Sequence, residues 1–160
     1  CPCGFFGHPT RSCNCSQTAV HKYLGKISGP MLDRIDLHVE VPPVEYSALS
    51  SNANEETSAE IKARVNKARK IQQERYKGTG ISCNARLTPD LIKKYCILTE
   101  DASKYLELSF ERLGMSARAY DRILKVARTI ADLDASEIIE KNHIFSAISF
   151  RSLDRKYWNT

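Results

Sequence analysis

Four cysteines near the start of the chain have the types and spacing of a metal-binding thiolate cluster. Cys1, Cys3, Cys13 and Cys15 form two Cys-x-Cys pairs separated by nine residues. Glycines and a proline in the intervening loop let the chain fold back, so four thiolates could hold a tetrahedral zinc ion. Structural zinc sites more often place two to four residues inside each pair, so free or labile thiols remain an alternative. Disulfides fit poorly, because the sequence shows no secretory signal.

A single arginine, Arg34, precedes a segment in which apolar and polar residues alternate. The alternation runs from Ile35 to Val41 and has the period of a half-buried β-strand, so we predict a strand over residues 35–41. Arg34 would then stand at the entrance of the strand, where it could form a salt bridge or reach a ligand or a neighbouring subunit. Asp33 and Asp36 could fix its side chain, although solvated acids are the simpler interpretation.

A second arginine, Arg118, lies in the first turn of a helix that we predict to begin at Ser116. The backbone N–H groups and the positive end of the helix dipole favour an anion there, and they disfavour a cation. Arg118 is therefore suited to contact a phosphate beside the start of this helix. The alternative is a surface arginine paired with a nearby acid.

The excess positive charge of the chain is concentrated in one segment. The net charge of the chain is +5, and residues 58–77 hold seven basic and two acidic side chains. Ile61, Val65, Ala68 and Ile71 recur at helical spacing, which predicts an amphipathic helix with a basic outer face. This face is either an ordinary solvated surface or a nucleic-acid contact, and in the second case we expect four residues to bind phosphates: Lys62, Lys67, Arg69 and Lys70.

The elements that would position these residues are mostly helical. Start and stop signals predict a short helix over 17–26, the basic helix, and further helices over 88–96, 99–113, 116–131 and 142–153. We therefore expect a mainly α fold: a cysteine-bearing loop, one strand, a long basic helix and a C-terminal helical bundle. Cys83 and Cys96 stand alone and are interpreted as small core residues.

Composition and length limit the possible classes of protein. The 160 residues are 42% hydrophobic and 27% charged, which is enough for one good core or two small ones. No apolar run approaches the roughly 20 residues that a membrane span needs, so we expect a cytoplasmic protein without membrane contact. Because the sequence begins at Cys1, inside a motif, we expect it to be a piece of a longer protein.

Three segments together resemble the magnesium-chelatase-like AAA+ ATPases, in the ComM/YifB branch. They are "CPCGFFGHPTRSCNCS", "GPMLDRIDLHVEVPPV" and "LGMSARAYDRILKVARTIADLD", in that order. The resemblance implies that Arg34 is an arginine finger acting in trans and that Arg118 is the sensor 2 arginine. It also implies ATP and Mg²⁺ as ligands of the full-length protein, and self-association in a ring that is expected to be a hexamer.

The same resemblance implies the domain organisation. Residues 1–45 would be the end of the AAA+ α/β core, 46–57 a linker, and 58–160 the helical lid. The sequence has no G-x-x-x-x-G-K-[S/T] phosphate loop, so we expect the chain alone neither to bind ATP tightly nor to hydrolyse it.

Three functions follow from these observations. The first is the C-terminal part of a ring-forming ATPase that remodels DNA, in branch migration during recombination or transformation. The second is a metal-stabilised adaptor that binds nucleic acid or protein without ATPase activity. The third is a chelatase subunit that inserts magnesium into a porphyrin, and the cysteine cluster argues against it because it resembles the ComM branch.

Overall fold

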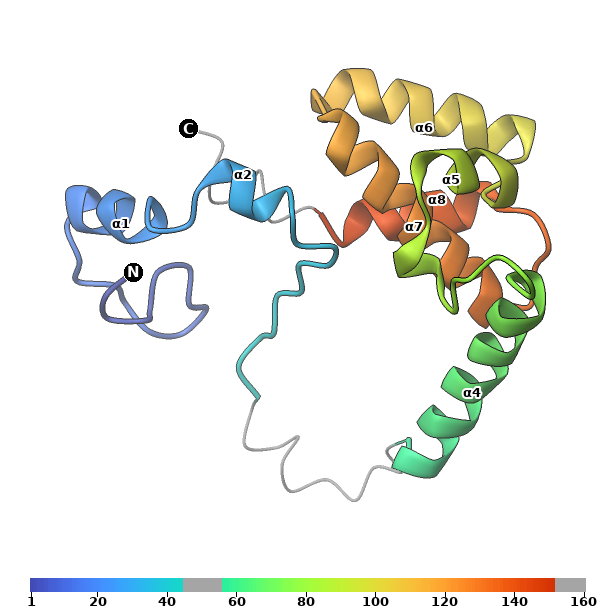
Figure 1. Ribbon diagram of the computed structural model, residues 1–160. Coiled ribbons are helices and arrows are strands. Elements are labelled where there is room, and N and C mark those ends of the chain that lie inside the picture. The colour runs from blue at the N-terminus through green and yellow to red at the C-terminus, as the bar shows by residue number, and fades with distance from the viewer. Residues whose placement is uncertain (45–55, 152–160) are drawn as a thin grey trace.

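The chain is mainly helical, as the sequence predicts (Figure 1). The computed structural model describes residues 1–44 and 56–151. Within them the elements are α1 (Gln17–Leu24), α2 (Gly29–Leu32), α4 (Ser58–Arg75), the 3₁₀ helix η1 (Asn84–Arg86), α5 (Pro89–Tyr95), α6 (Glu100–Leu113), α7 (Ala117–Leu133) and α8 (Lys141–Ser149). Most of the predicted linker 46–57, and the end of the last predicted helix beyond residue 151, lie outside the described residues.

Local capping interactions explain where the helices begin and end. Thr57 caps α4 in a capping box with Glu60, and the hydrogen bonds from the Thr57 side chain and backbone lower the pKa of the Glu60 carboxyl. The hydroxyls of Thr99 and Ser116 cap α6 and α7, as their positions in the sequence indicate. Gly114 ends α6 with a φ of 52°, a left-handed conformation that glycine adopts without strain.

The strand predicted over residues 35–41 is not formed in the described part of the chain. There the segment is extended but irregular, and the β-bridge that is present joins Leu98 to Ile139 elsewhere. The physical reason is the lack of a neighbouring strand among the described residues, since alternation specifies a strand only when a sheet covers one face. The apolar side chains are accordingly exposed, with Val39 at 62% and Val41 at 82%.

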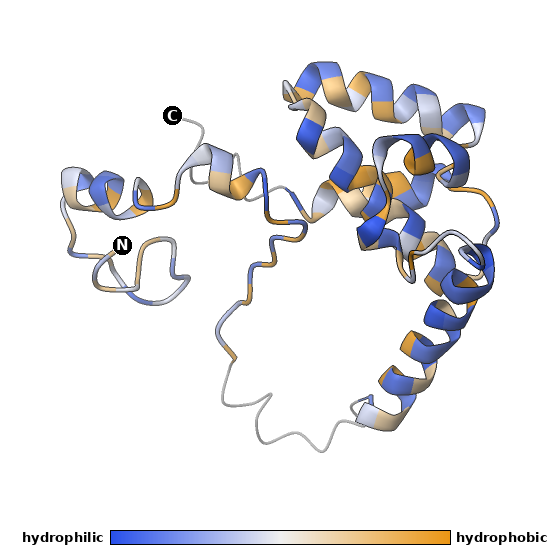
Figure 2. Cartoon of the chain, viewed as in Figure 1, coloured by the Kyte–Doolittle hydropathy of each residue, from blue (hydrophilic) through white to orange (hydrophobic). Residues whose placement is uncertain are grey.

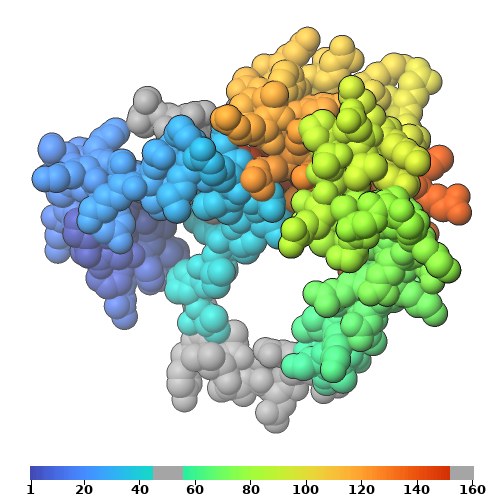
Figure 3. Space-filling view, in the orientation of Figure 1, coloured from blue at the N-terminus to red at the C-terminus, as the bar shows by residue number. Residues whose placement is uncertain are grey.

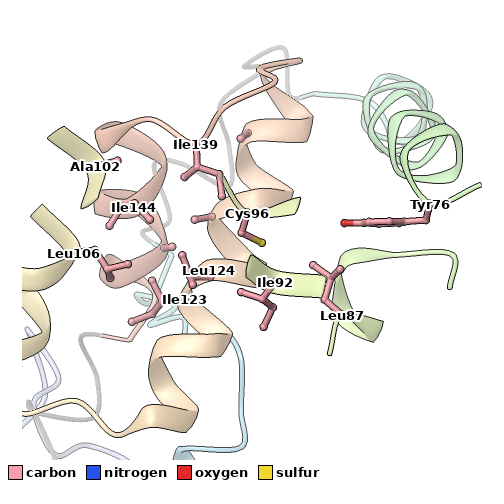
Figure 4. Packing of buried hydrophobic residues seen from close by; sticks show 13 residues of the cluster. Tyr76, Leu87, Ile92, Cys96, Ala102, Leu106, Ile123, Leu124, Ile139 and Ile144 are labelled. Atoms are coloured by element: carbon pink, nitrogen blue, oxygen red, sulfur yellow. The ribbon is translucent and has the colours of Figure 1, made fainter. Parts of the chain in front are cut away.

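The hydrophobic core lies between the helices of the C-terminal part. Helix α7 packs against α8, α4, α5 and η1, and α6 packs against α8. Figure 4 shows apolar side chains from several of these elements converging on α7. Cys96 is buried in this core, as predicted, whereas Cys83 is only half-buried at the start of η1. The core is formed by Tyr76, Leu87, Ile92, Cys96, Ala102, Leu106, Ile123, Leu124, Ala127, Ala131, Ile139, Ile144 and Ala147.

Among the described residues, helix α4 is covered by this core from Ala68 to its C-terminal end. Ala68, Gln72 and Tyr76 are buried, but Ile61 and Val65 are exposed at 43% and 39%. Figure 2 shows that the projecting part of α4 is predominantly hydrophilic. The apolar face predicted for the whole helix is therefore covered only in its second half, because no described segment lies against the first half.

A buried polar network fixes the attached end of α4. The Asp132 carboxylate accepts hydrogen bonds from Arg75 at 3.0 Å, from Arg128 at 3.1 Å and from the Asn84 side chain at 2.8 Å. Arg128 is fully buried, and desolvation outweighs the attraction of Asp132 and lowers the pKa of its guanidinium. Its other nitrogens donate to the backbone carbonyls of Ser136 and Glu137, so each of the three guanidinium nitrogens makes a hydrogen bond.

None of the helices in the described parts of the chain combines the length and the apolar character that a membrane crossing requires.

We predict that Asp132→Asn destabilises the chain by about 3 to 5 kcal/mol, because it leaves the buried Arg128 without its counter-charge. Urea denaturation followed by circular dichroism measures the change in free energy of unfolding. The matched control is Glu100→Gln, which breaks an exposed pair with Lys104 and should cost less than about 1 kcal/mol. Equal effects of the two substitutions would contradict the structural role assigned to Asp132.

Candidate functional site

The four N-terminal cysteines come together in space, as their spacing predicts. The Cys1 and Cys3 sulfurs are 3.4 Å apart, and the Cys13 sulfur lies 3.6 Å from each of them. All four Sγ atoms, including that of Cys15, lie within 4.8 Å of one another. None of the cysteines forms a disulfide, so the four sulfurs are available as ligands.

Tight turns in the loop between the two pairs produce this convergence. The Gly4 N–H donates to the Cys1 carbonyl at 3.0 Å, and the Phe6 N–H donates to the Cys1 sulfur at 3.1 Å. Gly4 has a φ of 81°, in the left-handed region that favours glycine. The His8 imidazole accepts backbone hydrogen bonds through Nδ1 and stabilises the turn instead of joining the sulfur cluster.

The sulfurs differ in acidity. A backbone hydrogen bond at Phe5, followed by thiol contacts from Cys15 and Cys13, lowers the pKa of Cys3 to about 7. A backbone hydrogen bond at Cys15 acts to lower the pKa of Cys13, but desolvation and the neighbouring thiols of Cys3 and Cys15 raise it overall. The Cys3 thiol therefore ionises more readily than the Cys13 thiol, and the thiolate is the form that binds a metal.

The sulfur positions fit a four-coordinate zinc ion. Zinc–sulfur bonds of about 2.3 Å in a tetrahedron place the sulfurs about 3.8 Å apart. The separations among the Cys1, Cys3 and Cys13 sulfurs, at 3.4 to 3.6 Å, are slightly below this spacing, and the whole set lies within 4.8 Å. The donor set and its geometry therefore suit a thiophilic metal, with no acid or histidine needed to complete the set.

Arg34 lies in the turn that follows α2 and is exposed. Its Nη1 donates to the Pro30 carbonyl at 3.1 Å, and among the described residues no acid pairs with it. The two flanking acids are bound elsewhere. Asp33 accepts from the Ser116 hydroxyl at 3.1 Å, and Asp36 forms an ion pair with Arg122. Neither acid fixes the Arg34 side chain, in contrast to the possibility that the sequence left open.

Arg118 is exposed in the first turn of α7, where the sequence places it. Within the described residues it has no acidic partner, so the predicted alternative of a surface ion pair is not observed there. Ser116, which caps this helix, is the residue that also donates to Asp33. The structure thus connects the segment that bears Arg34 directly to the helix that bears Arg118.

The four residues predicted to contact nucleic acid are all exposed on α4: Lys62, Lys67, Arg69 and Lys70. Two other basic side chains of this helix serve different purposes, since Arg64 pairs with Glu56 and Arg75 belongs to the buried network around Asp132. All four predicted residues remain on the exposed basic surface, with Lys62 in the uncovered first half of α4 and Lys67, Arg69 and Lys70 on either side of the buried Ala68.

Sequence reasoning missed Arg122 and Arg151. Arg151 is buried at 8% exposure, and it bonds the Ile35 carbonyl at 2.9 Å and lies 3.6 Å from the Asp33 carboxylate. These partners are separated by 116 and 118 positions in the chain, and no local pattern indicates such pairs. The only available signal was the presence of two unexplained acids on either side of Arg34.

Two models of known protein families match the chain. Residues 55–151 match the family described as "Magnesium chelatase, subunit ChlI C-terminal", and residues 1–49 match "Magnesium chelatase, subunit ChlI". These two matches cover the helical C-terminal part and the segment with the cysteine cluster and Arg34, respectively. The chain belongs to the magnesium chelatase subunit ChlI family.

Individual relatives agree with this assignment. The chain is 41% identical to YifB of Salmonella typhimurium over 155 residues, and 40% identical to competence protein ComM of Haemophilus influenzae over 151 residues. These alignments cover 96% and 93% of the chain but only 29% of each relative. A Mycobacterium tuberculosis protein is 32% identical over 151 residues, which is 94% of the chain and 29% of that protein. The chain thus spans less than a third of the length of these relatives.

Proposed function

We propose that this chain supplies two arginines to the nucleotide sites of a ring-forming AAA+ ATPase. Arg34 would act as the arginine finger, reaching the nucleotide of a neighbouring subunit, and Arg118 would act as sensor 2 on the nucleotide of its own subunit. The observation that supports this proposal is the exposure of both guanidinium groups, together with the binding of Asp33 and Asp36 by other residues.

An exposed arginine without an acidic partner is chemically suited to this role. Guanidinium stays protonated at any physiological pH and offers planar, paired donors that match phosphate oxygens. In phosphoryl transfer, negative charge spreads over the oxygens of the transferred group, and an arginine supplied from a neighbouring protein stabilises it. Mg²⁺ would offset part of the negative charge of the bound ATP, and we assign its ligands to a nucleotide-binding core outside this chain.

The start of α7 would add to the binding of nucleotide in the subunit's own site. Backbone N–H groups in the first helical turn carry partial positive charge, and Arg118 projects from the same turn. Arg118 is unfavourable for the helix itself, so a bound phosphate would convert a local cost into a stabilising interaction. This explains why a cation occupies a position that helix energetics alone disfavours.

We further propose that the ATPase acts on DNA. One relative is named a competence protein, and α4 exposes three lysines and an arginine to solvent. Phosphate contacts of this kind give affinity without base specificity. The alternative function is an adaptor that binds nucleic acid or protein through α4 without ATPase activity, and it rests on the same surface. A third candidate, magnesium insertion into a porphyrin, is favoured by the description of the matched family and by no contact within the described residues.

We also propose that the cysteine cluster holds one structural zinc ion. Cys1, Cys3, Cys13 and Cys15 would be its ligands, because their sulfurs already have nearly tetrahedral spacing. Zinc would supply the cross-link that keeps this short loop folded, since none of the residues 1–16 is buried. A metal-stabilised loop would give the segment leading to Arg34 a fixed starting point.

For the ATPase, we predict that Arg34→Ala lowers the turnover of a protein that joins this chain to its nucleotide-binding core by about 10³ to 10⁵. Arg112→Ala, an exposed arginine in the last turn of α6, should leave turnover unchanged. Rings that mix Arg34→Ala subunits with subunits carrying an inactivated phosphate loop should recover activity, because an intact finger then faces an intact site. Full turnover by Arg34→Ala alone would exclude the finger.

For the metal, we predict about one zinc ion per chain by elemental analysis after purification under reducing conditions. Cys3→Ser should lose the metal, and Cys83→Ser should retain it, because Cys83 lies outside the cluster. Zinc should be released as the pH falls, since protons compete with the metal for thiolate. The Cys96 thiol should stay unreactive toward thiol reagents both with and without zinc, because burial raises its pKa to about 11. A metal-free chain that binds no added zinc would contradict the proposal.

For nucleic acid, we predict salt-dependent DNA binding that weakens on Lys67→Gln/Lys70→Gln. Removing two phosphate contacts should reduce the slope of log affinity against log salt by roughly 2. The matched control is Lys93→Gln/Lys94→Gln, which removes two exposed lysines from α5. Fluorescence anisotropy across a salt series measures both slopes. Equal loss for the two double variants would assign the binding to net charge and not to α4.

A further inference from the structure

The short segment around Arg34 is bound to the C-terminal part of the chain at Asp33, Ile35, Asp36 and His38. Asp33 and Asp36 bind side chains from the start and the first turns of α7. The Ile35 carbonyl accepts from Arg151, and the His38 N–H donates to the Phe150 carbonyl at 2.7 Å. In the space-filling view, the segment that follows α2 lies against the helical part of the molecule (Figure 3). Arg34 is exposed within a stretch whose neighbours are all engaged.

These contacts converge on the part of α7 that carries Arg118. Ser116 forms the N-cap, accepting from the Ala119 N–H at 3.2 Å while its hydroxyl proton is donated to Asp33. Arg122, the partner of Asp36, is four residues after Arg118 and therefore lies on the same side of the helix. The two acids thus hold the helix on either side of Arg118, one before it and one after it.

Each acid in this contact is paired with an arginine from the C-terminal part of the chain. Asp33 meets the positive end of α7 and also lies 3.6 Å from Arg151, whose guanidinium is buried. The side chains of Arg122 and Asp36 are partly shielded, at 31% and 51% exposure. Burial of the Arg151 side chain and partial shielding of Asp33 and Arg122 make the contact more persistent than an isolated surface salt bridge.

We propose that Asp33 and Asp36 are positioning residues that couple the two arginines. A movement of α7 that brings Arg118 to the nucleotide of its own subunit would carry the Arg34 segment with it, through Ser116 and Arg122. The position of the arginine offered to the neighbouring subunit would then depend on the nucleotide state of its own subunit. This inference rests on the proposed roles of Arg34 and Arg118.

The coupling is a property of binding free energies and is therefore reciprocal. If nucleotide contact by Arg118 favours one position of Arg34, then engagement of Arg34 by the neighbouring site favours the same position of α7. Loss of the Asp33 and Asp36 ion pairs should separate nucleotide contact by Arg118 from the placement of Arg34, while both arginines remain in the chain. Turnover should fall because Arg34 is misplaced, whereas ATP affinity should change little because Arg118 and the start of α7 are intact.

The first experiment tests the contact in this chain without nucleotide. Hydrogen exchange followed by mass spectrometry reports the opening of residues 33–38, in which the His38 N–H is bonded to Phe150. Arg122→Asp should increase exchange of this segment several-fold, and the charge swap Asp36→Arg/Arg122→Asp should restore it. Lys104→Gln, which breaks the exposed pair with Glu100, is the control and should have no effect. Unchanged exchange in Arg122→Asp would overturn the proposal.

The second experiment tests the consequence in the protein that joins this chain to its nucleotide-binding core. Arg122→Asp should lower kcat by about 10-fold to 10²-fold with KM for ATP nearly unchanged, because it displaces Arg34, and the charge swap should restore kcat. If Arg34→Ala abolishes turnover but Arg122→Asp does not lower kcat, the coupling is wrong while the arginine finger stands. If Arg34→Ala leaves turnover intact, the proposed function itself fails, whatever the ion pairs do.

Discussion

The structure depends on the buried carboxylate of Asp132. It accepts hydrogen bonds from Arg75 of α4, Arg128 of α7 and Asn84 of η1, and these three elements have no other shared charged group. Arg128 extends the network to the carbonyls of Ser136 and Glu137, which lie on the connection to α8. Because a buried charge is costly unless fully bonded, these elements must take their positions together. The direction of α4 and the position of α8 are both consequences.

That network reaches the Arg34 segment indirectly, through α8. Helix α8 packs on α7, and the residues after it, Phe150 and Arg151, hold the segment through a backbone hydrogen bond and a buried guanidinium. A substitution at Asp132 that shifts α8 would therefore also shift residues 33–38, although the two lie far apart in the sequence. The core is the structural support for an exposed arginine that has few contacts of its own.

The helices could be predicted from the sequence, but the long-range contacts between them could not. Thr99, Gly114 and Ser116 act within one helical turn, so their capping roles could be predicted from local spacing. The alternation after Arg34 was a misleading local signal, because a strand needs a partner that the described residues do not provide. The grouping of the four cysteines was predictable, since Gly4 and short spacing leave the loop few ways to fold. The pairs of Asp33 and Asp36 were not.

An arginine with acids on both sides would ordinarily be a poor anion-binding group, because the acids lower the local positive potential. Here each acid is matched by a cation from another element, Arg151 for Asp33 and Arg122 for Asp36. The local group then contains three arginines and two carboxylates, and one positive charge is left over. The exposed side chain that carries it is Arg34, whose described contact is the neutral carbonyl of Pro30. The acids therefore do not neutralise Arg34 but fix where its charge is presented, which is what an arginine reaching toward a phosphate requires.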